Sequence, residues 1–280
     1  MNPQQRVANL SRRGALVRTA VISALVVLAS ACGSGGGQPD GAVRWRWDGK
    51  SAWEPQGEAP QCPADFNWQF PVESLDLVES SLVPGQVRSG DYKPHGGLRV
   101  KSPDTTVRAP VDGFIMRAAR YTELQTLADG SKPTSGVGET QTLLEIHHPC
   151  GVLYRLDHLN TLAPEIEAEL ASIPVRETSQ TTDLEDPVRI TQGQVIATRV
   201  GFTEGPVNSF FDFGVYDARR VQPNRRTLDQ LAAVLDKNET LELAAFSVCW
   251  FDFFGPETAR RLRELAIANT EGDDRGDVCS

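Results

Sequence analysis

The chain has few basic side chains outside its first thirty residues. The whole sequence contains 28 Lys and Arg against 37 Asp and Glu, a formal net charge of −9. Residues 1–31 hold four arginines and no acidic residue, so the remainder has 24 basic and 37 acidic side chains, a charge of −13. Binding to a polyanion needs a dense basic surface and the release of counterions. We therefore expect no nucleic-acid partner.

No apolar run near the N-terminus is long enough to cross a membrane. The run Thr19–Ala31 has 13 residues, and at about 1.5 Å per residue it cannot span a hydrocarbon layer of about 30 Å. It fits the apolar core of a signal peptide, and the small residues before Cys32 resemble a bacterial lipoprotein box. We expect residues 1–31 to be a lipoprotein signal peptide. Lipidated Cys32 would then anchor the protein to a membrane of the bacterial cell envelope, on its extracytoplasmic side. The alternative is ordinary secretion with Cys32 unmodified.

The sequence contains no Cys-x-x-Cys pair, which argues against a redox motif or a structural zinc knuckle. Setting Cys32 aside leaves Cys62, Cys150, Cys249 and Cys279, an even number. Outside the cytosol, two disulfides are the default expectation. Three pairings are possible. We favour Cys62–Cys150 with Cys249–Cys279, because the second bond would hold a C-terminal tail that would otherwise fray.

Residues 61–223 consist of short apolar, β-branched segments separated by turn residues. This pattern indicates an antiparallel β domain. Two polar stretches, 122–141 and 173–187, are predicted to be surface loops. The expected strands are Thr106–Val111, Gly113–Arg117, Thr142–His147, Val152–Leu156, Val188–Thr191, Val195–Thr198 and Phe210–Tyr216.

The segments that flank this β domain have other patterns. Residues 32–60 are rich in Gly, Pro and polar side chains and are expected to be a tether with a short N-terminal segment. Within it, Val43–Trp47 alternates Arg and Trp, which predicts a short strand packed at the domain edge, with a sugar-stacking platform as the alternative. Residues 224–280 show helical spacing, and Pro256 stands where a helix would begin. The fold class is therefore mainly β with a C-terminal helical extension.

Several motifs follow one another in an order that points to a known family. They are a His95-Gly96-Gly97 turn, an Ala109-Pro110-x-x-Gly113 turn, the segment Tyr154–Leu159 that contains His158, and a Gly193-Gln194-x-Ile196 turn. Their order and spacing resemble the lysostaphin-type (LytM-like) zinc endopeptidases of bacterial cell walls over residues 85–223. The resemblance implies a β-sheet built on a duplicated hybrid motif. Lipoyl- and biotinyl-type barrels share the Ala-Pro and Gly-Gln turns, so the histidine-bearing segments decide in favour of the peptidase family.

The resemblance also implies that the metal site has been lost. Active relatives hold zinc with a His-x-x-x-Asp segment and the second histidine of a His-x-His strand. Here the first histidine is His95, the aspartate position is Arg99, and the His-x-His pair falls on Phe210 and Asp212, while the family's other catalytic histidine corresponds to His158. Arg99 offers only donors and stays charged, so it repels a dication. We expect no catalytic residue, no metal and no cofactor, and we expect an ion pair between Arg99 and Asp212 in the metal's place.

Three functions remain open from the sequence. The first is a catalytically inactive cell-envelope protein that binds a cell-wall peptide or an envelope protein and regulates cell-wall hydrolysis. Another is a structural envelope lipoprotein whose cleft is filled by Phe210, Phe211 and the aromatic segment Trp250–Phe254, although core packing is the simpler role for that segment. The last is an active zinc peptidoglycan endopeptidase with the unusual ligands His95, Asp212 and His158.

Overall fold

One large mixed β-sheet organises the described part of the chain. The computed structural model describes residues 40–64, 66–88, 90–124, 138–203, 209–220, 226–235, 241–268 and 276–279. The expected signal peptide and Cys32 lie outside these residues. All of the described residues belong to one compact unit, Gly36–Ser280. Among them, no helix combines the length and the apolar character needed to cross a bilayer.

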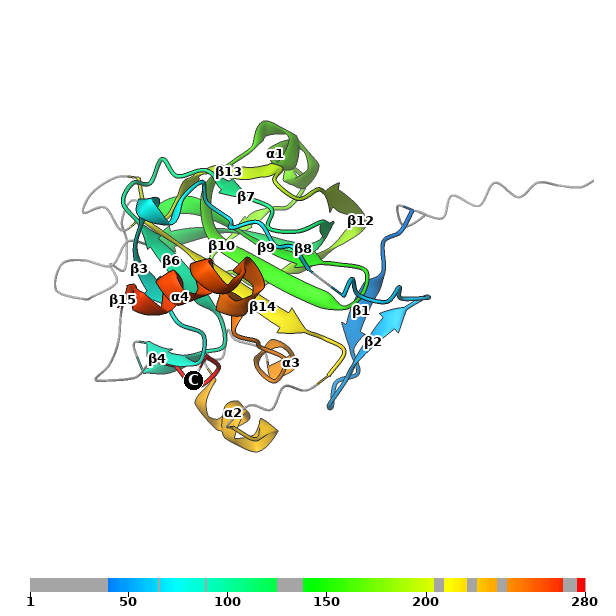
Figure 1. Ribbon diagram of the computed structural model, residues 1–280. Coiled ribbons are helices and arrows are strands. Elements are labelled where there is room, and N and C mark those ends of the chain that lie inside the picture. Colours follow the sequence, from blue (N-terminus) through cyan, green and yellow to red (C-terminus); the bar gives the residue numbers. More distant parts are fainter. Residues whose placement is uncertain are drawn as a thin grey trace, which may run out of the picture. The chain divides into compact units, whose positions relative to one another are not determined.

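The sheet has 11 strands, and its long central members lie side by side (Figure 1). Along its main path the order is β11 (Val175–Arg176), β8 (Gly113–Leu124), β9 (Gly138–His147), β10 (Val152–Leu162), β14 (Phe210–Asp217), β6 (Gly96–Val100), β3 (Val78–Leu82) and β15 (Ala266–Ile267). Three further strands join it: β12 (Thr182–Ile190) on β8, β13 (Val195–Val200) on β10, and β7 (Val107–Arg108) on β13.

The predicted mainly β fold is confirmed, with two differences in detail. Most pairs are antiparallel, but β11 pairs with β8 in parallel and β15 pairs with β3 in parallel, so the sheet is mixed. The predicted loop 173–187 is wrong, because it contains β11 and the start of β12. The side chains there are mostly exposed, so backbone pairing with β8 forms these strands without an apolar pattern. The ends of the other predicted loop, 122–141, are also wrong, because residues 122–124 belong to β8 (Gly113–Leu124) and residues 138–141 to β9 (Gly138–His147), while residues 125–137 lie outside the described residues.

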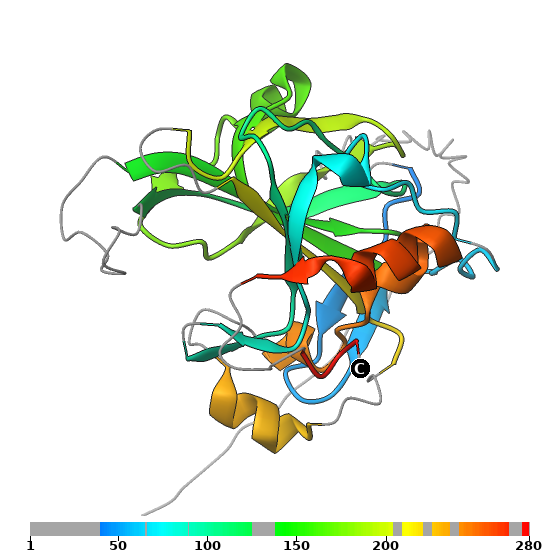
Figure 2. The same ribbon diagram turned by 60° about the vertical axis from the view of Figure 1, so that its left-hand side comes forward.

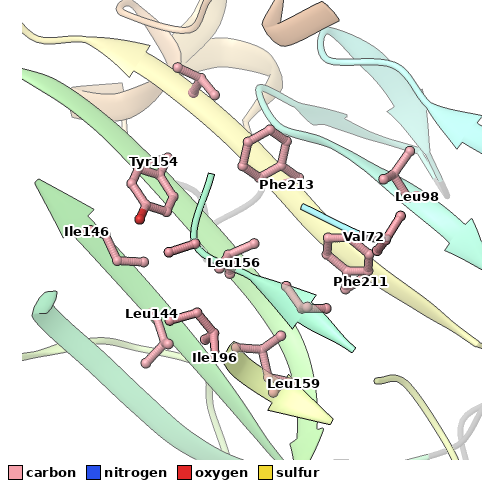
Figure 3. Packing of buried hydrophobic residues seen from close by; sticks show 14 of the residues in the cluster. Val72, Leu98, Leu144, Ile146, Tyr154, Leu156, Leu159, Ile196, Phe211 and Phe213 are labelled. Carbon is pink, nitrogen blue, oxygen red and sulfur yellow. The ribbon is translucent and has the colours of Figure 1, made fainter. Parts of the chain in front are cut away.

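One face of the sheet packs into the main hydrophobic core. Alternate residues of β10 and β14 supply it, as expected from the two-residue period of a strand. Figure 3 shows Tyr154 and Leu156 from β10 beside Phe211 and Phe213 from β14, and all four side chains are buried. The opposite face of the same strands carries charged residues, which form the candidate site.

The C-terminal helices predicted from the sequence are present, and they are short. They are α2 (Leu228–Val234), α3 (Leu241–Ala244), the 3-10 helix η2 (Trp250–Phe254) and α4 (Pro256–Glu264), while α1 (Pro164–Leu170) and the 3-10 helix η1 (Leu75–Leu77) occur earlier in the chain. Thr227 begins α2 with a capping box, in which its side chain and Gln230 bond reciprocally. Strand β15 follows directly on α4 (Figure 2), and it pairs with β3 in parallel.

The aromatic segment Trp250–Phe254 belongs to the main core. Trp250 is fully buried, and its ring centroid lies 5.2 Å from that of Phe213. Phe213 and Phe211 point to the face opposite Asp212, because residues at odd and even positions of a strand point to opposite sides. Phe211 and the segment Trp250–Phe254 therefore do not fill the cleft, and core packing is confirmed for Trp250, Phe251 and Phe254. Phe210, two residues from Asp212 on β14, lies on the same face as Asp212.

Two small hairpins complete the fold. The first joins β1 (Arg44–Trp47) to β2 (Trp53–Gln56), and its Trp45 and Trp53 are buried in a second, smaller core with Phe246. This burial confirms the predicted packed strand. The second hairpin joins β4 (Gln86–Arg88) to β5 (Asp91–Lys93) as a separate two-stranded sheet. Both favoured disulfides, Cys62–Cys150 and Cys249–Cys279, are present.

Candidate functional site

Strand register brings the predicted site residues to one face of the sheet. Asp212 on β14 lies opposite Gly97 on β6 and opposite Asp157 on β10. Phe210 lies opposite Arg99 in the same β14–β6 pair. Paired residues of antiparallel strands share a face, so the charged face runs across three neighbouring strands. His95 comes immediately before β6, at the same parity as Gly97.

His158 reaches this face through an irregularity in β10. As the residue after Asp157, it would point into the core in a regular strand. The β9–β10 register shifts between Leu156 and Leu159, and His158 has a φ of 61°, the one positive φ among the described non-glycine residues. This bulge turns the imidazole towards Asp212, and its Nε2 lies 3.6 Å from Asp212 Oδ2. Positive φ in a non-glycine residue is uncommon and clusters at functional sites.

His95 and Asp212 form the closest polar contact of the site. His95 Nε2 lies 2.9 Å from Asp212 Oδ2, and the two residues are 2% and 6% exposed. An ionised carboxylate only accepts hydrogen bonds, so His95 carries a proton on Nε2 and donates it to Asp212. His95, the histidine that the resemblance implies as the first metal ligand, therefore directs this nitrogen at an anion.

Arg88 supplies the guanidinium that faces Asp212. It comes from β4, and its Nη1 lies 3.5 Å from Asp212 Oδ1, while its Nη2 donates to the carbonyl of His95 at 2.9 Å. The expected ion pair between Arg99 and Asp212 is wrong: in the described residues Asp212 pairs with His95, His158 and Arg88. Arg99 lies opposite Phe210, two residues along β6 from the position opposite Asp212. No local sequence motif predicts that Arg88 belongs to the site, because tertiary packing alone brings the β4–β5 hairpin next to Asp212.

The surroundings of Asp212 keep it ionised. Burial alone would raise its pKa, but His95, the Arg88 guanidinium and a hydrogen bond from His158 outweigh burial and hold the pKa well below its usual range. Asp212 is therefore a fixed negative charge at neutral pH.

A second carboxylate, Asp157, supports His158 from the side. Asp157 Oδ1 accepts from Tyr121 Oη and from the backbone N–H of His158, both at 2.7 Å. Asp157 Oδ2 accepts from Arg155 Nη2 at 2.9 Å. Like Asp212, this buried carboxylate already has its own guanidinium. Arg155, Asp157 and Tyr121 are site residues that motif analysis missed.

Both ring nitrogens of His158 face acceptors. Gln141 Nε2 donates to the carbonyl of Gly201, which leaves Gln141 Oε1 to accept from His158 Nδ1 at 2.7 Å. The other nitrogen faces Asp212. An imidazole with a proton on each nitrogen is cationic. Burial lowers the pKa of His158, but Asp157, Asp212 and Glu123 outweigh it and raise the pKa.

Phe210 covers the remaining side of His158. The two ring centroids lie 4.4 Å apart with an interplanar angle of 49°. At this position the resemblance implies a histidine, whose nitrogens would bind or exchange protons. A phenyl ring can do neither, so its contribution is packing against the imidazole. Phe210, His158 and Arg99 are half-buried, whereas His95 and Asp212 are buried beneath them.

These residues fit zinc poorly. Asp157, His158 and Asp212 bring ligand atoms within 4.8 Å of one another. However, each carboxylate is matched by an arginine, and both histidines direct N–H groups towards carbonyl or carboxylate oxygens. Zinc needs deprotonated ligand atoms, and a guanidinium next to those atoms repels the zinc cation.

Comparison with protein-family models finds no match for this chain, and neither does a search of curated proteins. The similarity to lysostaphin-type enzymes therefore rests on the motif residues of this sequence, and the function argued from it is a proposal.

Proposed function

We propose that this protein is a lipid-anchored bacterial cell-envelope protein with a catalytically inactive, lysostaphin-like β domain that binds peptidoglycan peptides or a partner protein and so influences cell-wall hydrolysis. The proposal combines the lipoprotein box at Cys32 with the motifs of residues 85–223. The proposal requires that the residues of the site do not carry out metal-dependent hydrolysis.

The contact between His95 and Asp212 carries this proposal. In a zinc peptidase the histidine lone pairs point at a cation, whereas here His95 donates a hydrogen bond to a carboxylate that Arg88 also faces. A hydrolase further needs a base that can accept a proton. The raised pKa of His158 favours its protonated form, and Phe210 has no titratable group. The active-peptidase interpretation therefore has the least support.

A structural role remains the second candidate, because the centre of the site is closed. His95, Asp212 and Asp157 are all buried. The half-buried residues Arg99, Phe210 and His158 are the part of the site that a peptide could contact. These residues lie on the interior strands β6, β14 and β10, so we favour a peptide that contacts the face of the sheet through its side chains.

The test combines three measurements on the full lipidated chain: calorimetric titration with zinc chloride, release of soluble fragments from peptidoglycan, and co-sedimentation with purified peptidoglycan. We expect no stoichiometric zinc uptake, no fragments and saturable co-sedimentation. Phe210→Ala should weaken co-sedimentation, and the control Arg46→Ala, on the exposed side of the β1 hairpin, should not. Zinc-dependent release of fragments would overturn the proposal. Absence of co-sedimentation for every variant would favour the structural role.

A further inference from the structure

The β4–β5 hairpin that delivers Arg88 does not belong to the main sheet. Its two strands, Gln86–Arg88 and Asp91–Lys93, form a separate two-stranded sheet, to which an isolated bridge joins Tyr92 and Leu235. A two-stranded hairpin is marginally stable in water by itself. The position of Arg88 beside Asp212 therefore depends on what packs against the hairpin from outside.

The C-terminal segment 276–279 packs directly on this hairpin. Tyr92 Oη donates to Asp277 Oδ1 at 2.8 Å, and Tyr92 is fully buried. Two glycines allow the backbones to approach closely. A Cβ at Gly85 would lie 2.3 Å from Asp277 Oδ1, and a Cβ at Gly276 would lie 2.4 Å from the carbonyl of Pro84. Larger residues cannot occupy these two positions without displacing the segment.

Asp277 also connects the hairpin to the residues before α2. Arg226 Nε lies 2.7 Å from Asp277 Oδ2, and the same guanidinium lies over the Tyr92 ring, 4.9 Å from its centroid. Asp277 thus contacts both Tyr92, on strand β5 of the hairpin, and Arg226. Asp277 is itself held by the covalent bond two residues later in the chain.

The Cys249–Cys279 disulfide ties this segment to the main core. Cys249 immediately precedes Trp250, whose ring is fully buried against Phe213 of β14. The connection therefore runs from β14 through η2 and the disulfide to Asp277, and through Tyr92 to the hairpin. It returns to β14 where Arg88 meets Asp212.

We propose that residues 276–279 and the Cys249–Cys279 disulfide form a redox-sensitive strap that positions Arg88 against Asp212. Both cysteines are half-buried, so reagents can reach them. A dithiol reductant would open the strap by thiol–disulfide exchange. Its thiolate attacks one sulfur, its second thiol completes the exchange, and two electrons and two protons pass to Cys249 and Cys279 while the reductant becomes a disulfide. Opening frees the tail, and the hairpin then carries Arg88 away from the site. The inference is independent of peptide binding.

The test uses the double variant Cys62→Ser/Cys150→Ser, in which Cys249–Cys279 is the disulfide that dithiothreitol can open. Hydrogen exchange of the amides of residues 86–93 is compared before and after reduction. We expect amide exchange to become about tenfold faster on reduction. The hairpin then lacks the packing of residues 276–279, so it opens locally more often. The His158 ring resonances give a second readout: Arg88 and His158 both face Asp212, so loss of the Arg88 cation from Asp212 should raise the pH at which His158 titrates.

Two further variants keep the inference falsifiable if reduction unfolds the protein. Asp277→Ala leaves both disulfides in place but removes the contacts with Tyr92 and Arg226, and it should change both readouts in the same direction. The matched control is Asp252→Ala in η2, an exposed partner of Arg263, which should change neither. If mass spectrometry confirms free thiols while hairpin exchange and His158 titration stay unchanged, the strap does not position Arg88 and the inference is wrong.

Discussion

His95 Nε2 donates a hydrogen bond to Asp212 Oδ2 at 2.9 Å, inside a site where both side chains are almost fully buried. Asp212 is thereby the centre of the site: two histidines and one arginine converge on its carboxylate. A metal centre has the opposite polarity, with donor lone pairs converging on a cation. In this site the polarity is the reverse, because His95, His158 and Arg88 surround a carboxylate.

Removing Arg88 should destabilise the protein strongly. Arg88→Ala leaves the buried Asp212 charge without its guanidinium, and breaking a buried pair costs about 3–5 kcal/mol. Urea denaturation measures the loss. Arg46→Ala, whose ion-pairing side chain is 54% exposed, should change the free energy of unfolding by less than about 0.5 kcal/mol. Arg99→Ala should cost less than Arg88→Ala, and the reverse order would contradict the assignment of Arg88 as the partner of Asp212.

Neutralising Asp212 should lower the pKa of His158. The hydrogen bond and charge of Asp212 help to raise this pKa in the wild type, and Asp212→Asn removes the charge while keeping the size. NMR titration of the imidazole measures the shift. A raised folded-state pKa stabilises the protein below the unfolded value of 6.5, and this contribution is lost as the pH rises through the folded-state pKa. An unchanged His158 titration in Asp212→Asn would show that the two groups are not coupled.

Acid should destabilise the protein through His147. This residue is 1% exposed, and burial, together with Arg117 and Arg44, lowers its pKa to about 3. The unfolded chain takes up the proton near pH 6.5 and the folded chain does not, so stability is lost as the pH falls below 6.5. Between about pH 7 and pH 5 the loss is about 2 kcal/mol. Urea denaturation at both pH values measures it, and His147→Leu should remove this share of the pH dependence. Equal acid sensitivity in the variant would argue against His147.

Gly214→Ala should disturb the site from within β14. A Cβ at this position would lie 2.5 Å from Tyr216 Oη and 2.9 Å from His95 Cβ, so the side chains on the charged face must shift. Overpacking of this kind costs about 1–3 kcal/mol. Thermal unfolding measures the loss, and the His95 imidazole resonances should move with it. Wild-type stability and unshifted His95 resonances in this variant would show that the charged face can accommodate a methyl group at position 214, which would contradict the prediction.

Much of the β domain could be predicted from alternation and turn residues. The strands around Tyr154, Leu156, Phe211 and Phe213 have apolar side chains at every second position, and these are the residues that fill the main core. The C-terminal part of β12 was predicted as Val188–Thr191, but its first part, from Thr182, was missed because the residues there are mostly exposed and pair with β8 through the backbone. The disulfide pairing could be favoured from the sequence, but only the folded chain could select it, since four cysteines allow three connectivities.

The sequence alone determined which chemical groups this protein has at its site: histidines at positions 95 and 158, a carboxylate at 212, an arginine at 99 and a phenylalanine at 210. Tertiary structure decided how these groups pair. Arg88 approaches Asp212 from a separate hairpin, and a backbone bulge turns His158 onto the charged face. Such contacts depend on the packing of segments far apart in the chain and on a local φ value, and neither follows from residue spacing along a strand.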